Sequence, residues 1–314
     1  MYKYLFGNLK LTAWQQGITI AASWAWGVSV IVGMSVFQQR GIEAFAIWAF
    51  ANSITLALVG CLFAKLPLSI NRLLDVAPAW LRLPFAAIVY VIQFFSVLVN
   101  ITAIKTAFNM AAYPRLWVPF VLAMAICVFI WGFNHVAKGN IVKYLIWIVL
   151  LILMATSIIT GNAQITASTA QDINWAFYGA LILLCAPILD HQMWQRRTAF
   201  KISRPAPFVL ASIFFAIYMV LVGTVAAVGG GGIIIVAVIL LVAGSTLTSA
   251  LSAVTCQHSS IIKARIAMTI VFIFALLCMA FDFSVLQLWV AYGSLRIPFA
   301  VVAIAMILQR RDVA

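Results

Sequence analysis

The sequence predicts an all-α polytopic membrane protein with ten transmembrane helices. Hydrophobic residues make up 66% of the chain and charged residues 8%, so a water-soluble core would have too little polar surface to cover it. Apolar runs recur that can cross a bilayer core about 30 Å thick, which takes about 20 helical residues each. These runs lie at 13–37, 43–64, 84–106, 116–134, 140–161, 174–190, 205–228, 232–257, 266–283 and 285–309.

The basic residues fall mostly on one side of the membrane when the runs are threaded through it. The net charge of +13 therefore reflects topology, not a nucleic-acid partner, and we expect a multi-pass protein of the cell (cytoplasmic) membrane with both termini in the cytoplasm. Its partners are then the lipid bilayer and a small-molecule solute. The expected cytoplasmic residues are Lys3, Lys10, Lys65, Arg72, Arg82, Lys138, Lys143, Arg196, Arg197, Lys201, Arg204, Lys263, Arg265, Arg310 and Arg311, against Arg40, Lys105 and Arg115 outside.

The first apolar run is unusual in its middle, where SWAWGVS (Ser23–Ser29) replaces the aliphatic residues of a plain spanning helix. One interpretation is a tightly packed helix with a glycine contact face. The other is a helix that opens locally and turns free carbonyls into a cavity, which is tolerated at membrane depth only where protein or water satisfies them.

The sixth run contains Gly179 and Pro187, and an internal proline removes a helical hydrogen bond. An ordinary kink is one interpretation. The other is that helices one and six are both interrupted and each opens a block of five, at 1–161 and 174–314, around an external loop at 162–173. Five is odd, so the blocks are oppositely oriented, and such an inverted repeat points to a secondary transporter with its site near the midplane.

Hydroxyl side chains line one face of the eighth run. Small hydroxyl residues let helices approach and bond backbone, but adjacent Ser245 and Thr246 can also help coordinate a hard cation. On a helical wheel the following residues share an arc of roughly 120°: Ser245, Thr248, Ser249, Ser252, Thr255, Cys256 and Ser259.

Two further polar groups qualify as functional candidates. Arg296 lies inside the tenth run, where a charge costs at least a few kcal/mol unless it faces a cavity or partner; it would balance an anionic solute, stand in for a cation, or face water at a helix break near Pro298. On the cytoplasmic side, opposite charges after the sixth run can form a hydrogen-bonded latch, made of Asp190, Gln192, Gln195 and Arg196, whereas Arg197 and Lys201 are expected on a solvated basic face.

Three stretches together resemble the sodium/solute symporter family, which has the leucine-transporter fold. Ser23–Ile42 looks like the first core helix of that family. Asp190–Lys201, DHQMWQRRTAFK, resembles its D-Q-x-x-x-Q-R signature, and Ser245–Ser260 is similar to the S-T-x-D-S pattern of its eighth core helix. The resemblance covers a minimal ten-helix core, without the extra helices that most members carry.

The resemblance implies a sodium ion held by the hydroxyls of Ser245 and Thr246 and by backbone carbonyls near Ser23 and Trp26. It places substrate near Trp24, Trp26, Asn100, Tyr178 and Ser249. Two departures bear on this: His191 replaces the first glutamine of the signature, and Thr248 stands where the family has aspartate, which weakens the expectation of sodium coupling.

The predicted function is secondary active transport, sodium-coupled symport of a small organic solute by alternating access. A nucleobase:cation symporter-like or proton-coupled permease of the same fold is the alternative, and a non-transporting membrane sensor or scaffold is the alternative of another class. An enzyme is not expected, because acids and histidines lie mostly at helix ends and lack ligand spacing, and the cysteines show no CxxC motif. No cofactor or metal beyond sodium is therefore predicted, and the sequence leaves the solute open.

Overall fold

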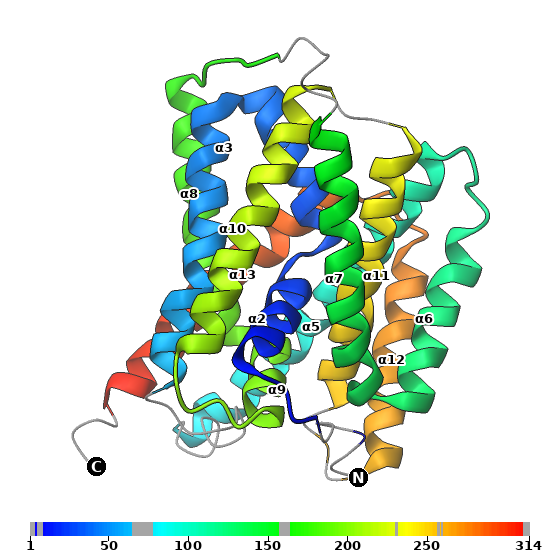
Figure 1. Cartoon of the computed structure of the whole chain (residues 1–314). Helices are drawn as coiled ribbons and strands as arrows, with labels where there is room; N and C mark the ends of the chain where they lie inside the picture. Colours follow the sequence, from blue (N-terminus) through cyan, green and yellow to red (C-terminus); the bar gives the residue numbers. More distant parts are fainter. Residues whose placement is uncertain are drawn as a thin grey trace.

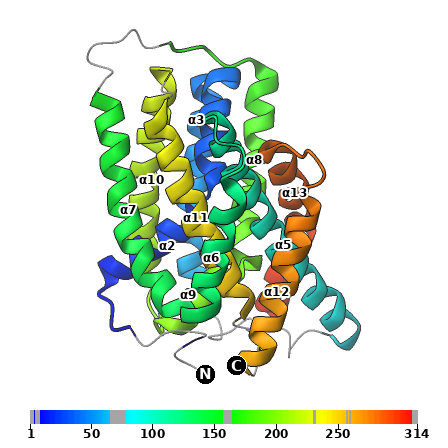
Figure 2. The same cartoon turned by 90° about the vertical axis from the view of Figure 1, so that its right-hand side faces the viewer.

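The computed structural model is a bundle of α-helices that run mostly along one common direction (Figures 1 and 2). It describes residues 4, 9–64, 78–156, 164–229, 232–255, 258 and 260–309, without the side chains of 306–309. The helices are α2 (Ala13–Trp24), α3 (Gly27–Phe63), α5 (Ala79–Met110), α6 (Trp117–Trp131), α7 (Phe133–Thr156), α8 (Ala170–Leu189), α9 (His191–Ala199), α10 (Ala206–Ala227), α11 (Ile233–Thr255), α12 (Ile261–Cys278) and α13 (Val285–Gln309).

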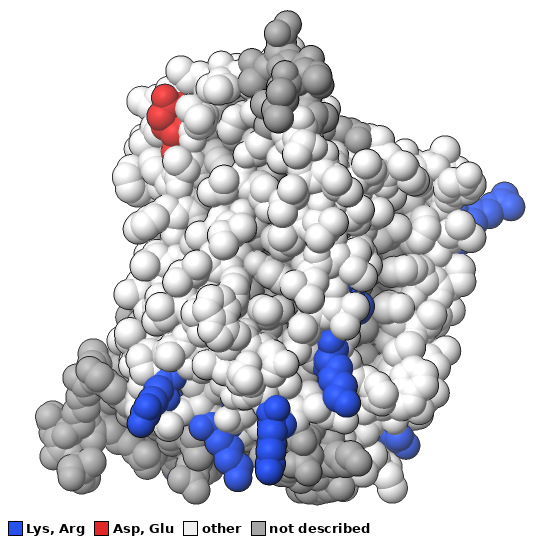
Figure 3. All heavy atoms as spheres, viewed as in Figure 1, with Lys and Arg blue, Asp and Glu red and all other residues white. Residues whose placement is uncertain are grey.

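Eight helices among the described residues are long and apolar enough to cross a membrane, and α6 is a shorter apolar helix. Together with the many large hydrophobic side chains exposed on the outside, this confirms a polytopic membrane protein. The start of α2 and the end of α13 lie at the same end of the bundle (Figure 1). Most of the basic side chains visible in Figure 3 gather at that end, and the acidic ones visible lie at the other.

Helix α3 contains the second part of the first predicted run and most of the second run, joined at Gly41. The backbone there has φ 86° and ψ 173°, a region open to glycine and not to other residues. A Cβ at Gly41 would collide with Ser168, whose hydroxyl accepts a hydrogen bond from the Ala44 amide. The chain folds back at this glycine, since Gly33 lies against the ring of Trp48 on the second half.

The halves of the sequence meet in the core of the bundle. The broadest helix contacts are those of α3 with α10 and α8, of α11 with α5 and α7, and of α10 with α2. The loop before α8 ends earlier than predicted, because Thr169 caps the helix in a reciprocal box with Asp172, so that α8 begins at Ala170. Cys256 and Ser259, the last cysteine and serine of the predicted hydroxyl face, lie outside the described residues.

Helix α3 packs closely against α11 and α5 at small residues, next to the place where the first helix is interrupted. Gly27, the first residue of α3, shows how closely: an added Cβ would lie 2.6 Å from the Cβ of Ala243 and 2.8 Å from that of Ala103. Neither neighbour is a flexible side-chain end. The glycine therefore lets α3 start directly against α11 and α5.

We expect Gly27→Ala to lower the apparent unfolding midpoint in detergent, with a cost of about 1–3 kcal/mol typical of overpacking. Gly139→Ala in α7 is the matched control, because nothing lies within 4 Å of its added Cβ and alanine favours helix. Differential scanning fluorimetry of both variants checks this. Equal midpoints for the two would contradict the close contact at Gly27.

Candidate substrate and ion site

The first helix is interrupted in the middle of the bundle, between α2 and α3. Ala25 (φ −73°, ψ 84°) and Trp26 (φ −78°, ψ 158°) leave the helical conformation. The Trp26 amide donates to the Trp24 carbonyl at 2.9 Å, outside the helical pattern. The amide of Gly27, which starts α3, donates to Asn100 Oδ1 on α5 at 3.3 Å. Asn100 thus satisfies one of the donors that the break exposes.

The Ala25 carbonyl at this break faces helix α11. It accepts a hydrogen bond from Thr246 Oγ1 at 2.9 Å, and both residues are fully buried. The predicted ion ligands Ser23 and Trp26 flank Ala25, but the Ser23 hydroxyl donates back to the Ile20 carbonyl at 2.7 Å. The Thr246 hydroxyl also lies 3.1 Å from the Val242 carbonyl of its own helix, so three neutral oxygens lie close together at this point.

Ser245, the other predicted hydroxyl ligand, turns toward α7 instead. With the Asn140 carbonyl oriented toward Arg196, the Asn140 amide donates to Ser245 Oγ at 2.7 Å and its carbonyl accepts from Arg196 Nη2 at 3.0 Å. This orientation satisfies both ends of the amide. Asn140 was not among the predicted site residues, because one amide in an apolar run carries no pattern.

The sixth predicted helix is also interrupted, at Asp190 between α8 and α9. Pro187 stays inside α8, so the break falls beyond the proline. Asp190 caps α9 with Oδ1, which accepts from the Gln192 amide at 2.9 Å. The indole of Trp194 donates to the Ile188 carbonyl at 2.7 Å across the break.

The predicted cytoplasmic latch is packed inside the protein. Asp190, Gln192, Gln195 and Arg196 are all at most 1% exposed. Gln195 Nε2 donates to the carbonyl and hydroxyl of Ser252 on α11, each at 3.0 Å. Gln192 Nε2 donates to Ser96 Oγ on α5 at 3.3 Å.

Arg196 connects the largest number of elements in this group. Its Nε donates to the Thr19 carbonyl on α2 at 3.1 Å, and Nη1 donates to the Gln192 carbonyl at 3.1 Å. Nη2 donates to Ser249 Oγ on α11 at 3.0 Å. The guanidinium is thus held by neutral oxygens from three helices, with Asn140 as a fourth contact.

The expectation that Arg197 lies on a solvated basic face is wrong. It is 2% exposed, with its guanidinium 5.1 Å from the ring centre of Phe63 and 5.9 Å from that of Trp194. The short helix α9 packs against α2, α8 and α11. Arg196 and Arg197 therefore both point into the protein. Lys201, two residues beyond the end of α9, is exposed as expected.

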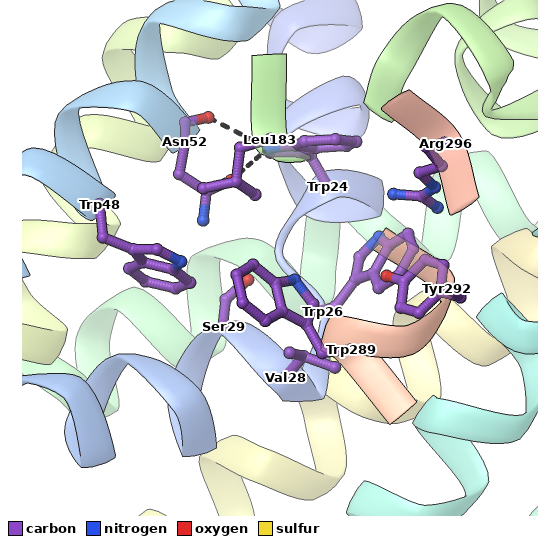
Figure 4. A pocket seen from close by; sticks show the side chains of 10 residues that line it. All are labelled: Trp24, Trp26, Val28, Ser29, Trp48, Asn52, Leu183, Trp289, Tyr292 and Arg296. Carbon is purple, nitrogen blue, oxygen red and sulfur yellow. Dashed lines mark hydrogen bonds between the residues drawn. The ribbon is translucent and has the colours of Figure 1, made fainter. Parts of the chain in front are cut away.

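A small pocket lies beside the first break, lined by aromatic rings (Figure 4). The rings of Trp26 and Tyr292 stack with centres 5.5 Å apart and planes 11° apart. The Arg296 guanidinium lies 4.2 Å from the ring centre of Tyr292 and 5.1 Å from that of Trp26. The cavity volume is about 20 Å³, and its lining residues are Trp24, Trp26, Val28, Ser29, Trp48, Asn52, Leu183, Trp289, Tyr292 and Arg296.

Only part of the predicted substrate set meets in this pocket. Trp24, Trp26 and Arg296 line it, and the Trp24 indole donates to Asn52 Oδ1 at 2.8 Å. Asn100 is on α5 and accepts a hydrogen bond from the Gly27 amide at the start of α3. The remaining two point elsewhere: Ser249 belongs to the Arg196 group, and Tyr178 is 41% exposed with its hydroxyl 2.6 Å from Ser294 Oγ.

Trp48, Trp289 and Tyr292 are pocket residues that the sequence did not single out. Each sits in an apolar run where an aromatic side chain is ordinary. Trp289 and Tyr292 precede Arg296 on the same helix by one to two turns, and this spacing was the one available signal.

The fold is similar to that of a solved Na⁺-coupled sialic acid symporter in a substrate-bound outward-open state. The TM-score is 0.64 at 14% sequence identity, and the match covers 98% of this chain and 79% of the symporter chain. No protein-family model and no curated protein sequence matches this chain. At this identity the similarity shows the fold alone.

We expect Arg196→Lys to destabilise the protein clearly, because a point charge cannot donate to the Thr19 carbonyl and the Ser249 hydroxyl in the fixed geometry of a guanidinium. Each buried hydrogen bond lost to a charged donor costs about 1.5–3 kcal/mol. The readout is the apparent unfolding midpoint in detergent.

Arg204→Lys is the matched control, since Arg204 is exposed in the loop between α9 and α10. A midpoint for Arg196→Lys as high as that of the control would show that Arg196 does not hold the three helices together.

Proposed function

We propose that the protein is a secondary active transporter, a sodium-coupled symporter of a small organic solute that works by alternating access. The observation that carries the proposal is the break at Ala25–Trp26. Its carbonyl side meets Thr246 on α11, and its ring side lines a small pocket, in a fold similar to that of a Na⁺-coupled symporter. Ion and solute would then bind on either side of one backbone interruption.

The proposal includes a five-plus-five inverted repeat. The first block would comprise the interrupted pair α2 and α3 through α7, and the second the interrupted pair α8 and α9 through α13. Interrupted first helices in both blocks are the pattern expected of transporters with a midplane site. Both termini would be cytoplasmic, which the clustering of basic side chains at their end of the molecule supports.

Sodium would be bound by Thr246 and the carbonyls of the opened helix, and by Ser245 once its hydroxyl has turned from Asn140 toward the break. The hydrogen bond from Thr246 to the Ala25 carbonyl brings two neutral oxygens to 2.9 Å, and uncharged oxygen ligands suit a hard monovalent cation. If a sodium ion replaced the hydrogen bond between Thr246 and the Ala25 carbonyl, α2 could shift against α11. The cavity holds about one water molecule by volume, so solute entry requires the helices around it to move apart.

The test is uptake into proteoliposomes from a pool of labelled urea, amino acids, carboxylates and nucleobases, with and without an inward sodium gradient. We expect wild-type uptake to depend on sodium. Ser245→Ala/Thr246→Val should lose at least tenfold of that sodium-driven rate, because both side-chain oxygens of the ion site are gone.

Thr224→Val on α10 is the matched control, because Thr224 is exposed and its hydroxyl bonds only the Val220 carbonyl of its own helix. Equal accumulation without sodium would contradict the coupling and favour the proton-coupled or nucleobase:cation alternative. No uptake of any solute would contradict transport and favour a sensor or scaffold.

A further inference from the structure

The pocket beside the first break presents hydrogen-bond donors and lacks an acid. No aspartate or glutamate is among its ten lining residues. Three buried donor atoms in that lining have no hydrogen-bond partner: Arg296 Nε, Arg296 Nη2 and Trp48 Nε1. Buried donors left unpaired are costly, so the pocket is built for a ligand that accepts hydrogen bonds.

The buried charges point the same way. Among the described residues, the buried side chains that can carry a full charge are Arg196, Arg197 and Arg296 against Asp190, with His191 also buried. The ion pairs within 4.0 Å in the described part of the chain are Arg40–Asp172 and Lys105–Asp282, so Arg296 interacts electrostatically with Asp190 but has no carboxylate at salt-bridge distance there. An excess of buried positive charge inside a membrane protein is stabilised by binding an anion.

Arg296 is held in a way that leaves its edge available. The guanidinium lies over Tyr292 and Trp26 at 4.2 and 5.1 Å from their ring centres, and this contact leaves Nε and Nη2 without a hydrogen-bond partner. Nε and one terminal nitrogen form the side of the fork that receives a carboxylate in bidentate pairing.

Donors also occupy the opposite side of the pocket. Figure 4 shows Trp48 and Asn52 across from Arg296, with Trp24 and Trp26 between them. Asn52 Oδ1 is taken by the Trp24 indole, so its free functional group is the NH₂. A solute with one oxygen function near Trp48 and Asn52 and a carboxylate near Arg296 would satisfy both sides.

We propose that this pocket binds a small organic carboxylate, with its carboxyl group paired to the Nε and Nη2 edge of Arg296. The assignment rests on the proposed transport function and names its substrate class. Trp26 and Tyr292 hold the guanidinium in place, and Trp48 and Asn52 select a second oxygen. Cations such as ammonium compounds are disfavoured, because Arg296 lines the pocket and no carboxylate does.

The experiment measures ligand-induced thermal stabilisation of the purified full chain in detergent with sodium present. The probes are acetate, pyruvate, lactate and benzoate, each tested against its neutral amide at equal concentration. A ligand that binds the folded state raises the unfolding midpoint. We expect at least one carboxylate to raise it and its amide to leave it unchanged.

Arg296→Gln should weaken that carboxylate by about tenfold to a hundredfold, the usual loss for a hydrogen-bonded charge, and the exposed Arg204→Gln should leave it unchanged. Trp48→Phe, which removes the indole N–H and keeps an aromatic ring, should weaken binding several-fold. This second variant keeps the test decisive if Arg296→Gln does not fold.

Stabilisation by the amides equal to that by the acids, or by chloride alone, would overturn the assignment, as would full carboxylate affinity in either pocket variant. Absence of stabilisation by every carboxylate would overturn it too. The outcome stays separate from the proposed function, because sodium-driven uptake of a neutral solute would reject the carboxylate and leave the transporter standing.

Discussion

A single buried guanidinium, that of Arg196, holds together the part of the site next to α9. Arg196 bonds a carbonyl of α2, a carbonyl of its own helix α9 and a hydroxyl of α11. A guanidinium buried away from water needs hydrogen-bond acceptors from the protein in place of water. Helices α2, α9 and α11 each supply one, so the guanidinium fixes their positions relative to one another. Since α2 carries the first break and α9 follows the second, Arg196 links the two interruptions.

That link explains why short α9 folds into the bundle. Its sequence is polar, and an exposed position would be natural for it. Yet Gln192, Gln195 and Arg196 each find partners on α5, α2 or α11, and Asp190 caps the helix that carries them. The polar groups are satisfied by neighbouring helices in place of water, which is the condition for polar backbone and side chains at depth in a membrane protein.

The helices and the neighbourhood of the breaks were predictable, because apolar length and the SWAWG and Asp190 stretches are local signals. The burial of individual side chains was not predictable in the same way. Arg197 was assigned to solvent because the rule for basic residues concerns the side of the membrane, not burial. Trp48 and Asn140 gave no signal, since their roles depend on which helix faces them, and that is set by packing between residues far apart in the sequence.

The two sides of the Ala25–Trp26 break differ in polarity, and this difference gives a physical route to coupling. Toward α11, the break offers the Ala25 carbonyl and Thr246 Oγ1, which are oxygens. Toward α13, the Trp26 ring supports a guanidinium whose free groups are N–H donors. A cation on the first side and an anion on the second would share one rigid dipeptide. The positive charge of the cation would lower the free-energy cost of burying the anion, and the reverse. Movement of either one alone would therefore be disfavoured.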